Sequence, residues 1–216
     1  MDTTTFRLKP GNYFQDEHPK DLILLHFTAG LSASSAYQTW IAPVAGVPQH
    51  VSTAYVVDPG GTAYQFFPPQ AWGYHLGMTQ NNSGWPNDKR SIAIEIANPG
   101  PLRRDRKDPN QINWWPRDFG TRWCSLSETD RYVKAPYRGF EYYAAFPKPQ
   151  HEAVRDLVGQ LCGQFQIAKT LPPLEKRGVY DPVYFSQYKG IASHQNFRAD
   201  KLDIGPAWDW SWLEVA

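Results

Sequence analysis

The chain has very little cysteine and almost no net charge. Its two cysteines, Cys124 and Cys162, among 216 residues are too few for a disulfide framework or a cysteine-based zinc cluster, and no C-x-x-C spacing occurs, so we expect buried free thiols. The 22 basic and 21 acidic residues leave a net charge of +1, which gives no field that would attract nucleic acid or an anionic membrane. We therefore expect no nucleic-acid partner.

The sequence also lacks a long apolar run. The longest one near the start, 22–25, is far shorter than the roughly 18 residues of a membrane span and is unlike the apolar core of a signal peptide. We therefore predict a protein with no membrane span that is made in the cytoplasm without an export signal. A hydrophobic fraction of 41% and an aromatic fraction of 15% predict a folded chain.

Hydrophobic patterning divides the chain into an arm, a core region and an insertion. Residues 1–20 are polar and broken by prolines and a glycine, which predicts an arm over the surface of a single domain at 21–216. Between about 100 and 148 no clear period is visible, which predicts a long irregular insertion. Strands are expected at 22–27, 51–57, 62–67, 91–97 and 190–194, the second and third as a hairpin, and amphipathic or capped helices at 32–40 and 149–165.

The strand expected at 91–97 carries one carboxylate, Glu95. The segment alternates strictly, so that three isoleucines share one face and Glu95 shares the other with two alanines. The small neighbours leave room for a ligand to approach the carboxylate. An edge strand with a solvated face is the alternative interpretation.

Two of the six histidines, His26 and His194, end strand-like segments. The second is followed by Lys201-Leu202-Asp203 in an extended stretch, where residues two apart point the same way. Two imidazoles and one carboxylate form a three-ligand set for Zn²⁺ that leaves a fourth position for water, as in catalytic zinc sites. A hydrogen-bonded core role for each histidine is the alternative.

Several segments in chain order resemble motifs of the zinc-dependent N-acetylmuramoyl-L-alanine amidases. These are LLHFTAG at 24–30, VSTAYVV at 51–57, AWGYHLG at 71–77, the Glu95 strand, and His194 followed by KLDIGPAWDW at 201–210. The resemblance is to the type-2 amidase family, which includes phage lysozyme-like amidases and peptidoglycan recognition proteins. It implies an α/β fold in which helices flank a central mixed β-sheet.

The resemblance also implies a site and a reaction. It makes His26, His194 and Asp203 the ligands of one Zn²⁺, Glu95 the general base and Lys201 the cation that stabilises the oxyanion. Two further residues, His75 and Asn98, could touch substrate, and a structural role is an equal alternative for His75 because it lies in an aromatic loop. The implied reaction is hydrolysis of the amide bond between the lactyl group of N-acetylmuramic acid and L-alanine of the stem peptide.

Three positions depart from the family pattern. Phe27 stands where many relatives have a second histidine, and Ile204 replaces a proline common after the aspartate. Thr53 occupies a position where some members carry a catalytic tyrosine, so Glu95 is expected to act as base alone.

Other functions stay open at this point. A non-catalytic peptidoglycan-binding module is one, although such modules typically lack a ligand and all three are present here. Serine or cysteine hydrolysis is disfavoured, because no G-x-S-x-G or cysteine nucleophile motif occurs. The biological role could be that of a phage endolysin or a delivered toxin acting on the cell wall, the latter with a cognate inhibitor protein, or that of a cytoplasmic enzyme recycling soluble muropeptides. Aromatic residues in the insertion mildly favour polymeric glycan as substrate: Trp114, Trp115, Trp123, Tyr132, Tyr137, Tyr142 and Tyr143.

Overall fold

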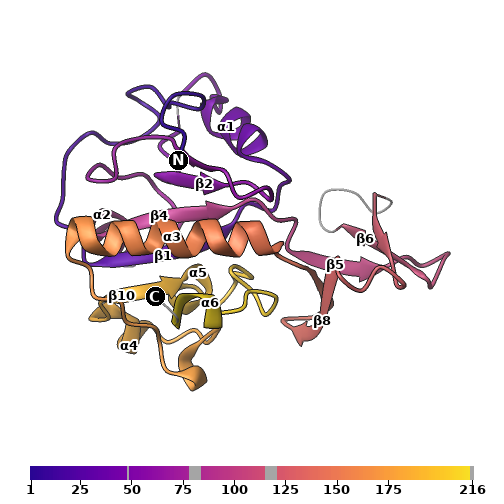
Figure 1. Cartoon of the computed structure of the whole chain (residues 1–216). Coiled ribbons are helices and arrows are strands. Elements are labelled where there is room, and N and C mark those ends of the chain that lie inside the picture. The colour runs from indigo at the N-terminus through magenta and orange to yellow at the C-terminus, as the bar shows by residue number, and fades with distance from the viewer. Residues whose placement is uncertain (48, 78–83, 115–120, 215–216) are drawn as a thin grey trace.

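The main β-sheet is mixed and lies at the centre of the molecule. The computed structural model describes residues 1–47, 49–77, 84–114 and 121–214 (Figure 1). The sheet has the order β10-β1-β4-β2-β3, in which β3 alone is antiparallel to its neighbour. The bounds are β1 Leu22–Phe27, β2 Tyr55–Val57, β3 Ala63–Gln65, β4 Ser91–Ile96 and β10 Gly190–Ser193. All of β1 is buried, which explains its continuous apolar run, because a central parallel strand is covered on both faces.

Helices lie on both faces of this sheet. The long helix α3 (Lys148–Phe165) crosses one face (Figure 1) and shares an apolar cluster with Ile23 and Leu25 of β1. On the other face, Leu22 and Leu24 form a second cluster with α4 (Pro182–Ser186) and α5 (His194–Phe197). The remaining helices are α1 Ala33–Ile41, α2 Gly84–Arg90, α6 Ser211–Glu214 and a 3-10 turn at Leu174–Lys176. The predicted α/β fold is confirmed.

The two predicted helices begin and end where their local chemistry requires. Ser32 caps α1, since its hydroxyl accepts a hydrogen bond from the Ser35 amide at 3.1 Å. A proline in the first turn of α3 fits a position whose N–H has no helical partner. This helix ends at Gln166, whose φ of 55° is left-handed.

The predicted hairpin is formed by β2 and β3. In the turn between them, Gly61 has a φ of 85°, and its amide donates to the Asp58 carbonyl at 2.9 Å. A Cβ at this position would lie 2.7 Å from the carbonyl oxygen of Pro149 in α3. Gly61 therefore lets the hairpin approach the helix closely.

The insertion is a regular antiparallel sheet, where the sequence predicts an irregular segment. Its order is β7-β6-β5-β9-β8, and it extends from the body of the molecule (Figure 1). The bounds are β5 Pro101–Arg104, β6 Gln111–Trp114, β7 Arg122–Ser125, β8 Tyr132–Tyr137 and β9 Phe140–Ala144. Register shifts between Ile112 and Asn113 and between Lys134 and Tyr137 interrupt the alternation of side chains, which hides the strand period. Of the aromatic residues expected to contact glycan, Trp115 lies outside the described residues.

The first twenty residues lie on the body of the molecule, and the two cysteines are as the sequence predicts. Isolated bridges from Asp2 to Tyr64 and from Phe14 to Trp72 attach the first twenty residues to the body. Cys124 and Cys162 are both buried and free. Within the ranges that the structure describes, no helix combines the length and apolarity needed to cross a membrane.

Candidate active site

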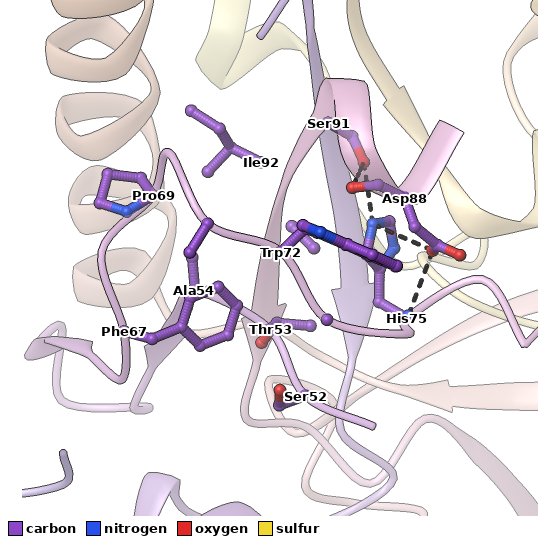
Figure 2. Close-up of a pocket in the computed structure, with 13 residues that line it drawn as sticks. Ser52, Thr53, Ala54, Phe67, Pro69, Trp72, His75, Asp88, Ser91 and Ile92 are labelled. Carbon is purple, nitrogen blue, oxygen red and sulfur yellow. Dashed lines mark hydrogen bonds and ion pairs between the residues drawn. The ribbon is translucent and has the colours of Figure 1, made fainter. Parts of the chain in front are cut away.

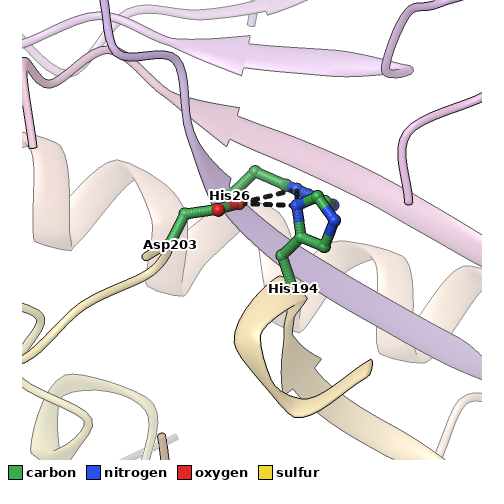
Figure 3. Close-up of side chains that lie close together, drawn as sticks. All are labelled: His26, His194 and Asp203. Atoms are coloured by element: carbon green, nitrogen blue, oxygen red, sulfur yellow. Dashed lines mark hydrogen bonds and ion pairs between the residues drawn. The ribbon is translucent and has the colours of Figure 1, made fainter. Parts of the chain in front are cut away.

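Three residues that can bind a metal meet where the parallel strands end. His26 is in β1, His194 directly follows β10, and Asp203 lies on the loop after α5 (Figure 3). Nδ1 of His26 is 3.0 Å from both Nδ1 of His194 and Oδ2 of Asp203, and the last two atoms are 2.9 Å apart. The residues are only 1%, 4% and 7% exposed. The fold therefore brings together the three residues that the sequence predicts as ligands.

The spacing of these atoms fits a small divalent cation. A tetrahedral ion with ligand bonds of about 2.0–2.2 Å separates its ligand atoms by about 3.3–3.6 Å. The observed separations of 2.9–3.0 Å reach this value after small outward rotations of the side chains. Each of the three atoms can offer a lone pair. Three lone pairs this close together in a buried place repel one another, and a metal ion between them would remove the repulsion. The cluster could therefore hold a metal.

The protonation of the cluster also suits a metal. Burial raises the pKa of Asp203, but the charge and hydrogen bonds of His194 and His26 outweigh it and bring that pKa well below its usual range. On the far side of the ring, Nε2 of His194 lies 3.0 Å from the carbonyl oxygen of Leu76. A carbonyl only accepts, so Nε2 carries a proton, and Nδ1 is the ring atom that would give up its proton to bind a metal.

Glu95 lies next to this cluster. It pairs in register with His26 across β1 and β4, so both side chains are on the same face of the sheet. Its Oε2 is buried and has no hydrogen-bond partner among the described residues. Burial raises the pKa of Glu95 to about 7, against the opposing effects of His26 and Lys201. Because β4 lies between β1 and β2, the edge-strand alternative is wrong.

Glu95 also lines a pocket beside the first helix. The other lining residues come from the end of β1 and from α1, and several carry hydroxyl groups: Thr28, Gly30, Ser35, Ala36, Thr39 and Trp40. A polar substrate group could therefore approach the carboxylate from this side.

Lys201 is close enough to Glu95 to lower the pKa of that carboxyl group. Its amino group forms no ion pair in the part of the chain that the structure describes, and the neighbouring Asp200 pairs instead with Arg198 at 2.6 Å. The Lys201 ammonium group is therefore available to a substrate group that lies next to Glu95.

The inserted sheet reaches this site through the turn between β8 and β9. The turn residues Arg138 and Gly139 have φ values of 45° and 84°, a conformation that asparagine and glycine fill most easily. The Arg138 guanidinium donates to the backbone carbonyl of Lys201, and the Tyr137 hydroxyl donates to the carbonyl of Gly178 at 2.9 Å. The insertion thus holds the segment that carries Lys201.

Comparison with known proteins identifies the family. The sequence model of the N-acetylmuramoyl-L-alanine amidases (Amidase_2) matches residues 16–206. This chain belongs to that family. The solved structure of AmiD from E. coli, in complex with anhydro-N-acetylmuramic acid-L-Ala-D-γ-Glu-L-Lys, shares the fold at 18% identity and a TM-score of 0.54. The match covers 96% of this chain but only 60% of AmiD.

A second solved structure, that of AmpD, has 15% identity and a TM-score of 0.51, over 99% of this chain and 90% of AmpD. At these identities the two structures show the fold alone. A search of the curated proteins finds no match to the sequence. The resemblance inferred from the sequence motifs is confirmed by the family match.

The amidase places Asn98 among backbone partners. Its Nδ2 donates to the carbonyls of Ala144 and Ala145 at 3.3 and 3.2 Å, and its Oδ1 accepts from the Gly100 amide at 2.7 Å. These bonds join β4 to both ends of the insertion. The substrate contact expected of Asn98 stays a prediction, but its amide already has a full set of protein partners.

His75 also lies inside the amidase, with a side chain only 3% exposed. Burial holds the pKa of this ring well below its usual value, and the neighbouring His26 and His194 act in the same direction. Figure 2 shows His75 joined to Asp88 and Ser91 beside a pocket that they line with Thr53 and others. Sequence reasoning missed Asp88, which lies in α2, and Ser91, whose one signal was a polar residue at the start of a buried strand.

A buried lysine supports the same region. Lys20, only 6% exposed, donates from Nζ to the carbonyls of Ala71, Lys89 and Ser91 at 2.9, 2.6 and 3.1 Å. Burial lowers the pKa of Lys20 to about 8. These three bonds connect the end of the arm to the loop before His75 and to the start of β4.

Proposed function

We propose that this amidase is a zinc-dependent hydrolase of the bond between N-acetylmuramic acid and L-alanine of the peptidoglycan stem peptide. The observation that carries the proposal is the convergence of three metal-ligand atoms beside the buried, unpartnered carboxyl oxygen of Glu95. The family match supports the same chemistry. The molecule bound in the AmiD structure contains the bond in question.

His26, His194 and Asp203 would hold one Zn²⁺, since two imidazoles and a carboxylate form a set typical of catalytic zinc. When bound there, zinc supplies a Lewis acid that polarises the substrate carbonyl and makes water more acidic. Both histidines would bind through Nδ1, the atoms that face one another in the cluster.

Glu95 moves the proton. Its free oxygen accepts a proton from the attacking water while the water oxygen bonds to the amide carbon. The same carboxyl group then returns the proton to the leaving nitrogen as the C–N bond breaks. The products are a lactyl carboxylate and a stem peptide with a free L-alanine amine. The pKa of about 7 given to Glu95 by burial suits both steps near neutral pH.

Lys201 meets the negative charge that develops on the carbonyl oxygen when water adds. Its closeness to Glu95 and the lack of an ion-pair partner among the described residues support this role.

Product analysis tests the proposal. The zinc-loaded enzyme is incubated with intact sacculi and, separately, with soluble muropeptides, and the products are identified by mass spectrometry, with Glu95→Gln as the inactive control. Stem peptides with a free N-terminal L-alanine are expected. Binding to sacculi without release would favour the non-catalytic module, and cleavage at another bond would contradict the assignment.

The two substrates also separate the biological roles. Cleavage of sacculi would support action on the cell wall, as an endolysin or as a delivered toxin with its inhibitor protein, and cleavage of muropeptides alone would support recycling. The buried state of Tyr142 and Tyr143 shows that part of the aromatic content of the insertion serves its own core.

A further inference from the structure

Hydrogen bonds run from the metal ligand His26 into the protein core. Nε2 of His26 lies 3.1 Å from Nδ1 of His75, and Nε2 of His75 lies 2.8 Å from Oγ of Ser91. The Ser91 hydroxyl itself lies 2.6 Å from the carbonyl oxygen of Asn87. Every step of this series is within normal hydrogen-bond distance.

The last acceptor fixes the direction of the whole series. A carbonyl only accepts, so the Ser91 proton points at Asn87 and Ser91 Oγ offers a lone pair to His75. The proton between these two groups therefore belongs to Nε2 of His75. In a neutral buried ring, Nδ1 of His75 is then an acceptor, and the proton between the two rings belongs to Nε2 of His26.

We propose that His75 is a positioning residue of the metal centre, which holds the Nε2 proton of His26 and so presents the unprotonated Nδ1 of His26 to the metal. The inference rests on the proposed zinc site. It gives His75 a role behind the ligand, where the sequence left both a substrate contact and a structural role open.

The next residue performs the same task for the other histidine. The Leu76 carbonyl accepts from Nε2 of His194 at 3.0 Å, so the dipeptide 75–76 orients both imidazole ligands. Asp88 anchors this dipeptide, because its Oδ1 accepts from the backbone amides of His75 and Leu76 at 3.2 and 3.0 Å. Asp88 is 1% exposed, which makes the anchor rigid. Partners of this kind fix the tautomer and ring orientation of metal-bound histidines.

Zinc affinity of matched variants tests the role of His75. His75→Leu removes the acceptor at similar bulk, while His75→Asn keeps an oxygen near the position of Nδ1. His151→Leu is the control, since His151 is also buried, at 5% exposed, but packs on Trp208 and Trp212. Affinity is measured by competition with a chromophoric chelator, and the fold of each metal-free variant by circular dichroism.

We expect His75→Leu to weaken zinc binding by about 10- to 100-fold, with substantial recovery in His75→Asn and no change in His151→Leu. A folded His75→Leu variant with wild-type affinity would overturn the proposal. Absence of zinc binding by the wild type would instead overturn the metal centre itself, so the two failures are distinguishable.

A spectroscopic measurement needs no variant. Long-range ¹H–¹⁵N correlation spectra of the zinc-loaded wild type report which ring nitrogen of each histidine carries the proton. Protons on Nε2 of both His26 and His75 are expected. A proton on Nδ1 of His75 would refute the direction of the hydrogen bonds and the proposal with it.

Discussion

Replacing Lys201 by methionine should separate transition-state stabilisation from structural support. The substitution keeps the apolar stem and removes the charge that would face the developing oxyanion. Loss of one such donor costs about 10²–10³ in kcat, or about 2.7–4 kcal/mol. Zinc content should be unchanged, and KM should change little because the lost contact forms only during reaction. Since Lys201 forms no ion pair within the described ranges, the melting temperature should stay near that of the wild type.

The same variant should shift the pH profile in a defined direction. Glu95 must be ionised to act as a base, so activity rises as pH passes through its pKa. Burial raises this pKa from 4.5 to about 7, and Lys201 opposes that rise. Removing Lys201 should therefore move the acid limb of kcat/KM to higher pH. This shift tests the closeness of Lys201 to Glu95, whereas the loss in kcat tests its role at the oxyanion.

Steady-state kinetics from pH 5 to 9 and a melting curve give both results, with Lys148→Met as the control. Lys148 is an exposed lysine whose partner is Glu152 in the same helix. An unchanged kcat in Lys201→Met together with a lowered melting temperature would refute the catalytic role.

Four further predictions concern the base, the metal and the arm. Glu95→Gln should keep zinc and lose about 10²–10⁴ in turnover, and near-normal turnover would exclude Glu95 as the base. Metal-free Glu95→Gln should have a larger free energy of unfolding than metal-free wild type above pH 7. The pKa of Glu95 is about 7 in the folded protein against an ordinary value of 4.5, so the wild type loses stability as pH rises between these two values. Denaturant unfolding at pH 4 and pH 8 measures the difference, which should vanish at pH 4. His194→Ala should lower bound zinc well below one ion per chain after dialysis, and full retention of metal by this variant would contradict the ligand assignment. Lys20→Met leaves three backbone carbonyls without their donor and should lower the free energy of unfolding by about 1–3 kcal/mol, whereas an unchanged urea midpoint would show that water replaces the lysine.

The parts of the fold that the sequence predicts well are those with a regular period and a clear end. The apolar run of β1, the serine cap of α1 and the stripe of α3 each follow from local chemistry, and each lies where it is expected. The sequence points to His26 and His194 because each lies at the end of a buried strand, and to Asp203 because it sits two residues after Lys201. Local patterns left a core role open for both histidines, and the family resemblance supplied the full ligand set; the convergence itself follows because the ends of parallel strands meet at one edge of the sheet.

The parts that the sequence does not reveal depend on contacts between distant segments. The inserted sheet has short strands, two register shifts and a proline at 136 inside β8, so no alternation of useful length survives. The partnership of His75 with Ser91 and Asp88 is set by the packing of a loop against the start of β4. Nothing in the spacing of these residues indicates that the His75 ring should bond to His26 on one side and to Ser91 on the other.

The bond from Arg138 to the carbonyl of Lys201 has a consequence for protein engineering. The loop that carries Lys201 is not a transferable part of the core sheet, because one of its anchors is Arg138 of the insertion. A chimera that takes the core from this chain and the insertion from a relative would keep His26, His194 and Asp203 but lose this anchor of the lysine segment. Loop and inserted sheet must be exchanged as one unit, and amides in both should become exposed to hydrogen exchange together when the sheet opens.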